Sequence, residues 1–441
     1  MEISLETRRY SSLETEIITQ EEPKSNSVLI IPNKFPLNQE KKISLLKQLF
    51  KLRVQLCISL TASLLSCISG MHLGWIGPTI LKLSSKDSEV PLTTTDISWL
   101  TMMLPLGGII GPTFGSIFST YFGRKRAILI GTIPSIIAWT LIFFATTKYE
   151  LYAAQLFSGL TVGTSFVVLP TYLGEIASPN IRGILATLIG LQYFFGVAIE
   201  SIIAPYVSLK VNALTGAVLP IFLVSIFIWM PESPYFYVIK RKWESAKKTL
   251  KILKQDSNID EEFDGIKLFI EEEKLDATTL ISSLRLKTNQ FAIGLVLASM
   301  TIQEFSGINV TIAYGEMILN IENSPISAHA GGIILNLIGI FASLIGCLMV
   351  DKWGRRSLAL LSPFGAIVPL ILIGSYFHME YVNYKFKSME YLPLIGLILH
   401  KITFSIGMGP LPFVYLSETL STNIKGFASV VACTKLYFIL S

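Results

Sequence analysis

Apolar residues in this chain are gathered into long blocks, and short polar segments separate one block from the next. Most blocks reach or exceed the eighteen or so residues that a helix needs to cross a bilayer. They are too long and too uniformly apolar for the alternating strands of a membrane barrel. Because only helices and closed barrels span membranes, the pattern predicts an all-α integral membrane bundle. The blocks cover residues 54–81, 96–118, 127–147, 151–173, 184–206, 214–230, 291–319, 330–350, 357–378 and 392–417.

The order of the blocks predicts two halves joined by a polar linker. An eleventh block opens near Phe427 and runs to Ser441, so we expect about ten full spans plus a partial eleventh. Two stretches in the linker have helical periodicity with polar faces, which predicts short surface helices. The expected organisation is a disordered cytoplasmic tail at 1–53, a six-helix half at 54–230, the linker at 231–290, and a shortened second half at 291–441.

Composition and charge narrow the class of protein. The chain has 441 residues, of which 51% are hydrophobic and 15% charged, too few charges to cover a soluble protein of this length. Its basic residues form no stripe with interleaved aromatics, so a nucleic-acid partner is not expected. With the first tail placed in the cytoplasm, 28 of the 36 Lys and Arg residues fall on the inner side. The positive-inside rule therefore predicts a cytoplasmic N-terminus.

Two basic clusters repeat in register. Tyr121–Arg126 (YFGRKR) lies between the second and third blocks of the first half, and Asp351–Arg356 (DKWGRR) lies at the matching place in the second. Glu175 and Arg182 follow the fourth block, and Glu418 and Lys425 follow the tenth, each pair seven residues apart. The repeat indicates an internal duplication of a six-helix unit, which is typical of one large class of secondary transporters.

Position suggests a role for these charges. All of them sit at the predicted cytoplasmic ends of spans, where arginines can pair with carboxylates of neighbouring helices. Pairs between the halves would hold the inner side shut and would break when it opens; the alternative is that the charges only anchor the topology. The predicted gating residues are Arg124, Lys125, Glu175, Arg182, Asp351, Arg355, Arg356, Glu418 and Lys425.

Taken together, the motifs resemble those of the sugar porters of the major facilitator superfamily. They are Gly123-Arg124-Lys125, Pro170–Gly183 (PTYLGEIASPNIRG), Pro231–Pro234 (PESP), Gln303–Asn309 (QEFSGIN), Asp351–Arg356 and Gly407–Phe413 (GMGPLPF). The segments Gly70–Ile80 and Leu92–Leu100 most resemble the insect facilitated trehalose transporter branch. The resemblance implies facilitated transport of a trehalose- or hexose-class sugar across the plasma membrane by alternating access. It implies no enzyme activity and no cofactor, with a small sugar and the lipid bilayer as partners and the oligomeric state left open.

A neutral sugar is rich in hydroxyls, so its site needs amides and aromatic faces. Gln303 and Asn309 supply two amides in the seventh block, and the glycine between them allows that helix to break. In the family, the matching Gln and Asn bond sugar hydroxyls, and an aromatic at Tyr314 gates the outer side; the alternative is that the amides only join helices. The predicted substrate-binding residues are Gln303, Glu304, Asn309, Tyr314, Gln192, Asn336 and Phe413.

The chain also departs from the family pattern. Glu304 replaces a second Gln, the polar position of the fifth span falls at Gly190, the amide of the eighth falls at Gly339, and the Trp of the tenth is Phe413. These losses keep two alternatives open, a transport-inactive membrane sensor or scaffold and a facilitator of another polyol or organic solute.

Ionisable residues inside the apolar blocks are functional candidates by default. They are His72, Glu200, Glu304, Glu316, His400 and Lys401. We expect His400 and Lys401 near the outer surface, with Lys401 extending its ammonium into water. The family's proton-coupling positions hold His72 and Gln155 here, which favours facilitated diffusion.

Overall fold

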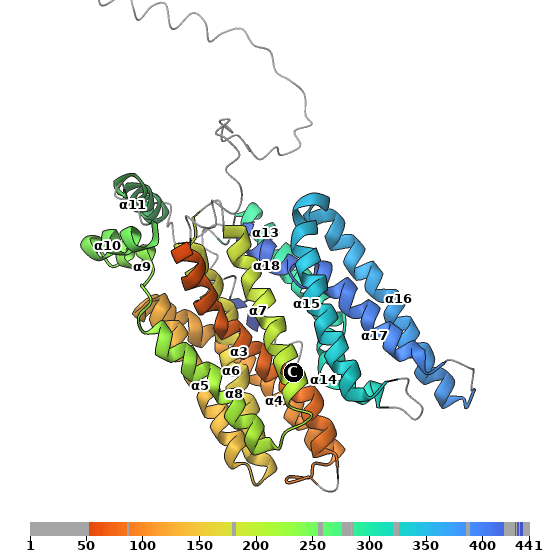
Figure 1. Ribbon diagram of the computed structural model, residues 1–441. Coiled ribbons are helices and arrows are strands. Elements are labelled where there is room, and N and C mark those ends of the chain that lie inside the picture. The colour runs from red at the N-terminus through yellow and green to blue at the C-terminus, as the bar shows by residue number, and fades with distance from the viewer. Residues whose placement is uncertain are drawn as a thin grey trace, which may run out of the picture. The chain divides into compact units, whose positions relative to one another are not determined.

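The computed structural model describes residues 53–85, 88–178, 182–254, 259–275, 284, 286–320, 326–384, 389–418, 428, 430, 431, 433 and 434. Within these ranges every regular element is a helix, as Figure 1 shows. This confirms the predicted all-α class. The predicted tail at 1–53 lies almost wholly outside the described residues.

The first half of the bundle consists of six helices. They are α3 (Arg53–Leu83), α4 (Thr94–Phe122), α5 (Arg124–Phe144), α6 (Lys148–Ile176), α7 (Arg182–Ile203) and α8 (Leu209–Phe227). Two of them begin at a capping box, in which Thr93 pairs with Asp96 and Thr147 with Glu150. Each box satisfies backbone N–H groups that have no partner within the helix, and so fixes where α4 and α6 begin.

Three short helices lie between the halves: α9 (Pro234–Ile239), α10 (Trp243–Lys254) and α11 (Asp260–Leu275). Their apolar faces meet in a small core of their own, which includes Val238, Leu250, Phe263 and Ile270. Charged residues cover the opposite faces, as expected for surface helices.

The second half continues with helices that are more often interrupted. They are α13 (Lys287–Phe305), α14 (Ile308–Leu319), α15 (Ala328–Trp353), α16 (Arg355–Tyr381), α17 (Tyr391–Thr403), the π-helical turn η2 (Phe404–Met408) and α18 (Leu411–Glu418). The seventh block is split at Gly307, whose φ of 76° is left-handed. The break that the glycine predicts is therefore confirmed.

In the described part of the chain, nine helical segments are long and apolar enough to cross a membrane. The pairs α13–α14 and α17–η2 each count once among them, and α7 adds the shorter apolar stretch Leu188–Ile203. Each predicted apolar block up to the tenth thus corresponds to helical structure. The partial eleventh lies mostly outside the described residues.

Close packing of α4 on α6 depends on glycines of both helices. A Cβ at Gly111 would lie 2.7 Å from the carbonyl oxygen of Leu160 and 2.8 Å from the Cα of Gly163. Gly107 and Gly115 lie on the same face of α4 and also point at α6. α4 thus presents a face of small residues and α6 supplies a matching one, so the two backbones approach closely.

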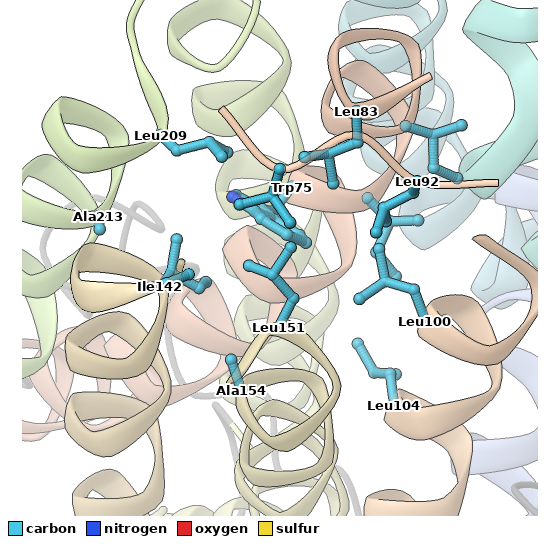
Figure 2. Close-up of a cluster of buried hydrophobic side chains, with 14 of the residues drawn as sticks. Trp75, Leu83, Leu92, Leu100, Leu104, Ile142, Leu151, Ala154, Leu209 and Ala213 are labelled. Carbon is cyan, nitrogen blue, oxygen red and sulfur yellow. The ribbon is translucent and has the colours of Figure 1, made fainter. Parts of the chain in front are cut away.

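Large side chains fill the core where α3 to α6 and α8 converge. Trp75 and Trp139 are almost fully buried there, together with Leu100, Leu151 and Leu209. Figure 2 shows Trp75 lying among the aliphatic side chains of neighbouring helices. This packing joins the helices of the first half, and Ile312 and Tyr314 of the second half pack against its edge.

Candidate functional site

The direction of the spans places the two Gly-Arg turns at one end of the bundle. Successive spans run in opposite directions, so the turn between α4 and α5 lies at the same end as the turn between α15 and α16 (Figure 1). We call this the Gly-Arg end and the opposite one the far end. The candidate site extends from one end to the other along the contact between the halves.

At the Gly-Arg end, Arg124 and Glu175 form a half-buried ion pair. Nε and Nη2 of Arg124 donate to Oε1 of Glu175 at 3.1 and 2.8 Å. The hydroxyl of Ser233 donates to the other carboxylate oxygen, and the guanidinium lies 5.5 Å from the centre of the Phe236 ring. Both charges are therefore held by several partners at once, which makes such pairs stronger than isolated surface ones.

Glu232 caps the start of α5 in the same network. Its Oε1 accepts the backbone N–H groups of Lys125 and Ser233 at 3.0 and 2.9 Å. Its Oε2 lies where a Cβ at Gly123 would be, and Gly123 has a φ of 106°. The first Gly-Arg turn thus needs its glycine both for backbone conformation and for space. Burial raises the pKa of the Glu232 carboxyl, against the opposing effect of these hydrogen bonds.

Among the predicted gating residues, the ion pair that the structure describes is Arg124–Glu175. It joins α5 to α6 within the first half, whereas the sequence predicts pairs between the halves. Lys125 donates to the backbone carbonyl of Ile228 at 2.6 Å, and the backbone carbonyl of Arg355 accepts from Tyr415. Arg356 is exposed. Outside the described side chains or residues lie Arg182, Asp351, Phe413, Glu418 and Lys425.

Between the two ends of the bundle, the break between α13 and α14 leaves backbone carbonyls available for hydrogen bonds with side chains. The hydroxyl of Ser306 donates to the carbonyl of Gln303 at 2.6 Å, while the Ser306 carbonyl bonds Nε2 of His400 at 2.9 Å. His400 is fully buried on α17. It therefore ties the tenth span to the broken seventh, contrary to the predicted place near the outer surface.

The predicted binding amides surround this break. Gln303 is buried, its Nε2 reaches the Gly409 carbonyl at a long 3.4 Å, and its Oε1 has no partner in the described structure. Asn309 donates to Oε2 of Glu304 at 2.6 Å. A buried amide oxygen without a partner can accept a hydrogen bond from a ligand hydroxyl at little cost. Gln192 is half-buried on α7.

Two hydrogen bonds join the halves toward the far end. The hydroxyl of Tyr314 on α14 lies 3.2 Å from that of Thr101 on α4, and Nδ2 of Asn336 on α15 donates to Ser201 on α7 at 2.5 Å. Helix contacts of α14 with α3 and of α15 with α7 accompany them. The halves are therefore in direct contact on the far-end side of the broken span.

Behind this contact lies a small cavity of about 30 Å³. Among its lining residues are Ser201, Glu316, Asn336 and Lys401. Lys401 is only 4% exposed, so the expectation that it extends into water at the surface is wrong. Packing decided its position: Gly339 on α15 leaves room for the lysine side chain to run inside the bundle.

His72 is held by hydroxyls of the first half. Its Nε2 lies 2.7 Å from Oγ of Ser135, its Nδ1 lies 2.9 Å from Oγ of Ser158, and its ring stacks on Trp139 at 4.9 Å. Gln155, the other position considered for proton coupling, is fully buried. Neutral groups therefore satisfy both ring nitrogens of His72.

Several contacts of the site were not among the predicted residues. Thr101 and Ser201 carry hydroxyls that any apolar span contains, so nothing in the sequence singles them out, whereas Ser233 lies in the PESP motif. Glu232 belongs to the PESP motif, which contributes to the resemblance but carries no predicted role. Lys401 is among the ionisable residues that the sequence marks inside spans, but its expected place near the outer surface left it out of the predicted binding residues.

The fold and the site define a helical membrane transporter of two related halves. The solved structures that it resembles include the proton:xylose symporter XylE bound to 6-bromo-6-deoxy-D-glucose, with a TM-score of 0.72 and 20% identity over 88% of this chain and 86% of that one. Another is a partially occluded, inward-open XylE from E. coli, with a TM-score of 0.71 and 19% identity over 88% and 90%.

Sequence comparison gives the family. The Sugar (and other) transporter family matches residues 58–438, and the chain belongs to it. Facilitated trehalose transporter Tret1 of Culex quinquefasciatus is 30% identical over 86% of this chain and 74% of its own. Tret1 of Polypedilum vanderplanki is 29% identical over 86% and 76%. The expected family is confirmed, and its members are transporters, not enzymes.

Proposed function

We propose that this protein carries a sugar, of the trehalose or hexose class, across the plasma membrane by facilitated diffusion. One observation carries the proposal: the seventh span breaks beside the contact between the halves and presents a buried, unpartnered amide oxygen of Gln303. Such a break is tolerated at membrane depth where the backbone is buried in protein or lines a water-filled cavity, and in transporters discontinuous helices form the solute site. Membership of the sugar transporter family supports the sugar as cargo.

The mechanism we propose is alternating access between two firm halves. The described state has the halves joined toward the far end, through Tyr314 with Thr101 and Asn336 with Ser201. The Gly-Arg end holds its ion pair inside the first half in this state. When the far end opens, the gating residues of that end would meet across the halves and close it, so each end is sealed by different contacts.

Orientation follows from charge. Most Lys and Arg residues lie in the tail, the linker and the turns of the Gly-Arg end, so we place that end in the cytoplasm. The contacts that join the halves in the described state then lie on the outer side of the broken span. Transport without proton coupling is supported by His72, whose ring nitrogens both bond serine hydroxyls.

Counterflow into proteoliposomes tests this function. Vesicles loaded with unlabelled trehalose or glucose should accumulate the labelled sugar transiently, and a pH gradient should leave the rate unchanged. Accumulation driven by the gradient would overturn uniport. Binding of sugar without any counterflow would instead favour a sensor.

A further inference from the structure

We propose that the cargo is an acidic member of the hexose class and that Lys401 binds its carboxylate once the halves part at this cavity. The inference rests on the proposed transport function and specifies the substrate class of that same site. A sugar acid such as a uronate has the required chemistry, since it joins several hydroxyls to a single negative charge.

The first support is the state of the Lys401 ammonium. It lies 5.3 Å from the centre of the Phe194 ring, and no carboxylate of the described residues lies within ion-pair distance. The side chain is 4% exposed and lines the cavity. A charged group held inside a membrane bundle is costly unless a counter-charge or several hydrogen bonds compensate it. The contact with one aromatic ring offsets only part of this cost.

The second support is the space made for this side chain. A Cβ at Gly339 would lie 2.7 Å from Cε and 3.5 Å from Cγ of Lys401. The lysine therefore passes directly over the glycine and reaches from α17 in the second half to Phe194 on α7 in the first. Its place at the contact between halves is set by packing, so the charge is a fixed feature of the cavity wall.

The negative charge in the cavity wall is already engaged. Oε2 of Glu316 lies 2.7 Å from Nδ1 of His329, and its Oε1 lies against Gly332, where a Cβ would come within 2.6 Å. Glu316 is thus held along α15, away from an ion pair with Lys401. A carboxylate from the cargo would meet an ammonium with three donors, for which the described residues supply the Phe194 ring but no carboxylate.

The neutral groups beside Lys401 suit the rest of such a cargo. The amide of Asn336 and the hydroxyl of Ser201 line the same cavity and now bond each other across the halves. When the halves part, both become available to sugar hydroxyls. A single cation balances a monoanion, so a carboxylate fits better than a doubly charged phosphate.

The test compares matched ligands on the full chain, purified in lipid nanodiscs, by titration calorimetry. D-glucuronate and D-glucose differ mainly in a carboxylate, and glucose 6-phosphate supplies the dianion. We expect glucuronate to bind about tenfold or more tightly than glucose, as a charge-assisted hydrogen bond allows. Lys401→Met should abolish this preference, whereas Lys401→Arg should keep it.

Lys82→Met is the control for removing a lysine. The ammonium of Lys82 donates to the backbone carbonyls of Ala204 and Val207 at the far end, outside the cavity. This variant should retain the preference for glucuronate. The comparison of ligands on the unmodified chain needs no variant, so it decides the proposal even where Lys401→Met fails to fold.

Each outcome has one meaning. Equal affinities for glucose and glucuronate would overturn the carboxylate while leaving sugar transport standing. A preference that survives Lys401→Met would place the recognition elsewhere and overturn the role of Lys401. Tighter binding of glucose 6-phosphate would overturn the monoanion. Absence of binding by every sugar would contradict both this inference and the proposed function.

Discussion

At the scale of single residues, Gln303 combines a buried side chain with incomplete hydrogen bonding. Its side chain is 8% exposed, yet only a long hydrogen bond to the Gly409 carbonyl engages its amide nitrogen, and its oxygen has no partner in the described structure. Structural amides inside a protein are usually satisfied on both atoms. The unsatisfied oxygen is therefore available to accept a hydrogen bond from a ligand.

Gln303→Ala should weaken the affinity for the transported solute about three- to tenfold. The reason is the loss of one neutral hydrogen bond in a partly dehydrated site, worth roughly 0.5–1.5 kcal/mol. Equilibrium binding to the purified protein measures it.

Gln55→Ala is the matched control. Gln55 is also buried, but it bonds Ser178 and the Leu253 carbonyl, at the Gly-Arg end of the first half. Its loss should lower thermal stability and leave affinity unchanged. Unchanged affinity in Gln303→Ala would remove the broken span from the binding site.

Sequence predicts residue types better than it predicts partners. The QEFSGIN motif identifies Gln303 and Asn309. It cannot show that the Asn309 amide donates to Glu304, or that the Gln303 oxygen has no partner in the described structure. Lys401 was expected at the surface because nothing in the sequence of its own helix indicates a buried position. Its burial depends on Gly339, a residue of a different helix 62 positions earlier in the chain.

At the scale of elements, glycines decide how closely helices approach. The spacing of Gly107, Gly111 and Gly115 predicts one small face on α4, because residues four apart share a side of a helix. That α6 is the partner, with Gly159 and Gly163 facing them, follows only from the fold. Periodicity reveals which side of a helix is adapted for contact, not which helix makes it.

Gly111→Ala should destabilise the first half. Its Cβ would lie 2.7 Å from the Leu160 carbonyl oxygen, so α4 and α6 must move apart, at a cost of about 1–3 kcal/mol. Thermal unfolding in detergent micelles measures the change. In contrast, Gly190→Ala on α7 meets no atom within 4 Å and should be neutral or slightly stabilising, since alanine favours helix. Equal effects of the two substitutions would contradict the packing account.

At the scale of the whole molecule, the sequence predicts that there are two halves. It does not predict how the halves are arranged relative to each other. Alternating apolar blocks and repeated charge motifs predict the duplication from the sequence alone. Which end is closed depends on small energy differences between arrangements of the same helices, and no local pattern records these. The structure supplies this information through the contacts of α7 with α15 and of α14 with α3.

Arg124→Ala should slow exchange across the membrane more than it weakens binding. The Arg124–Glu175 pair lies at the Gly-Arg end and touches no residue of the broken span, so its loss changes the balance of conformations. Rates of equilibrium exchange and binding affinities, measured on the same preparation, test this. Lys247→Ala, which removes the exposed pair with Asp260 on the linker, should change neither. A collapse of affinity with exchange preserved would contradict the gating role.

Alternating access requires the far end to open, and a reversible cross-link tests this requirement most directly. Asn336 and Ser201 touch across the halves at 2.5 Å, so cysteines at both positions can be joined by a short thiol-reactive linker in a chain whose own cysteines are replaced. Counterflow of labelled sugar is then measured before linking, after linking and after reduction. Alternating access predicts that linking abolishes counterflow and that reduction restores it. Counterflow that continues undiminished in the linked protein would contradict it.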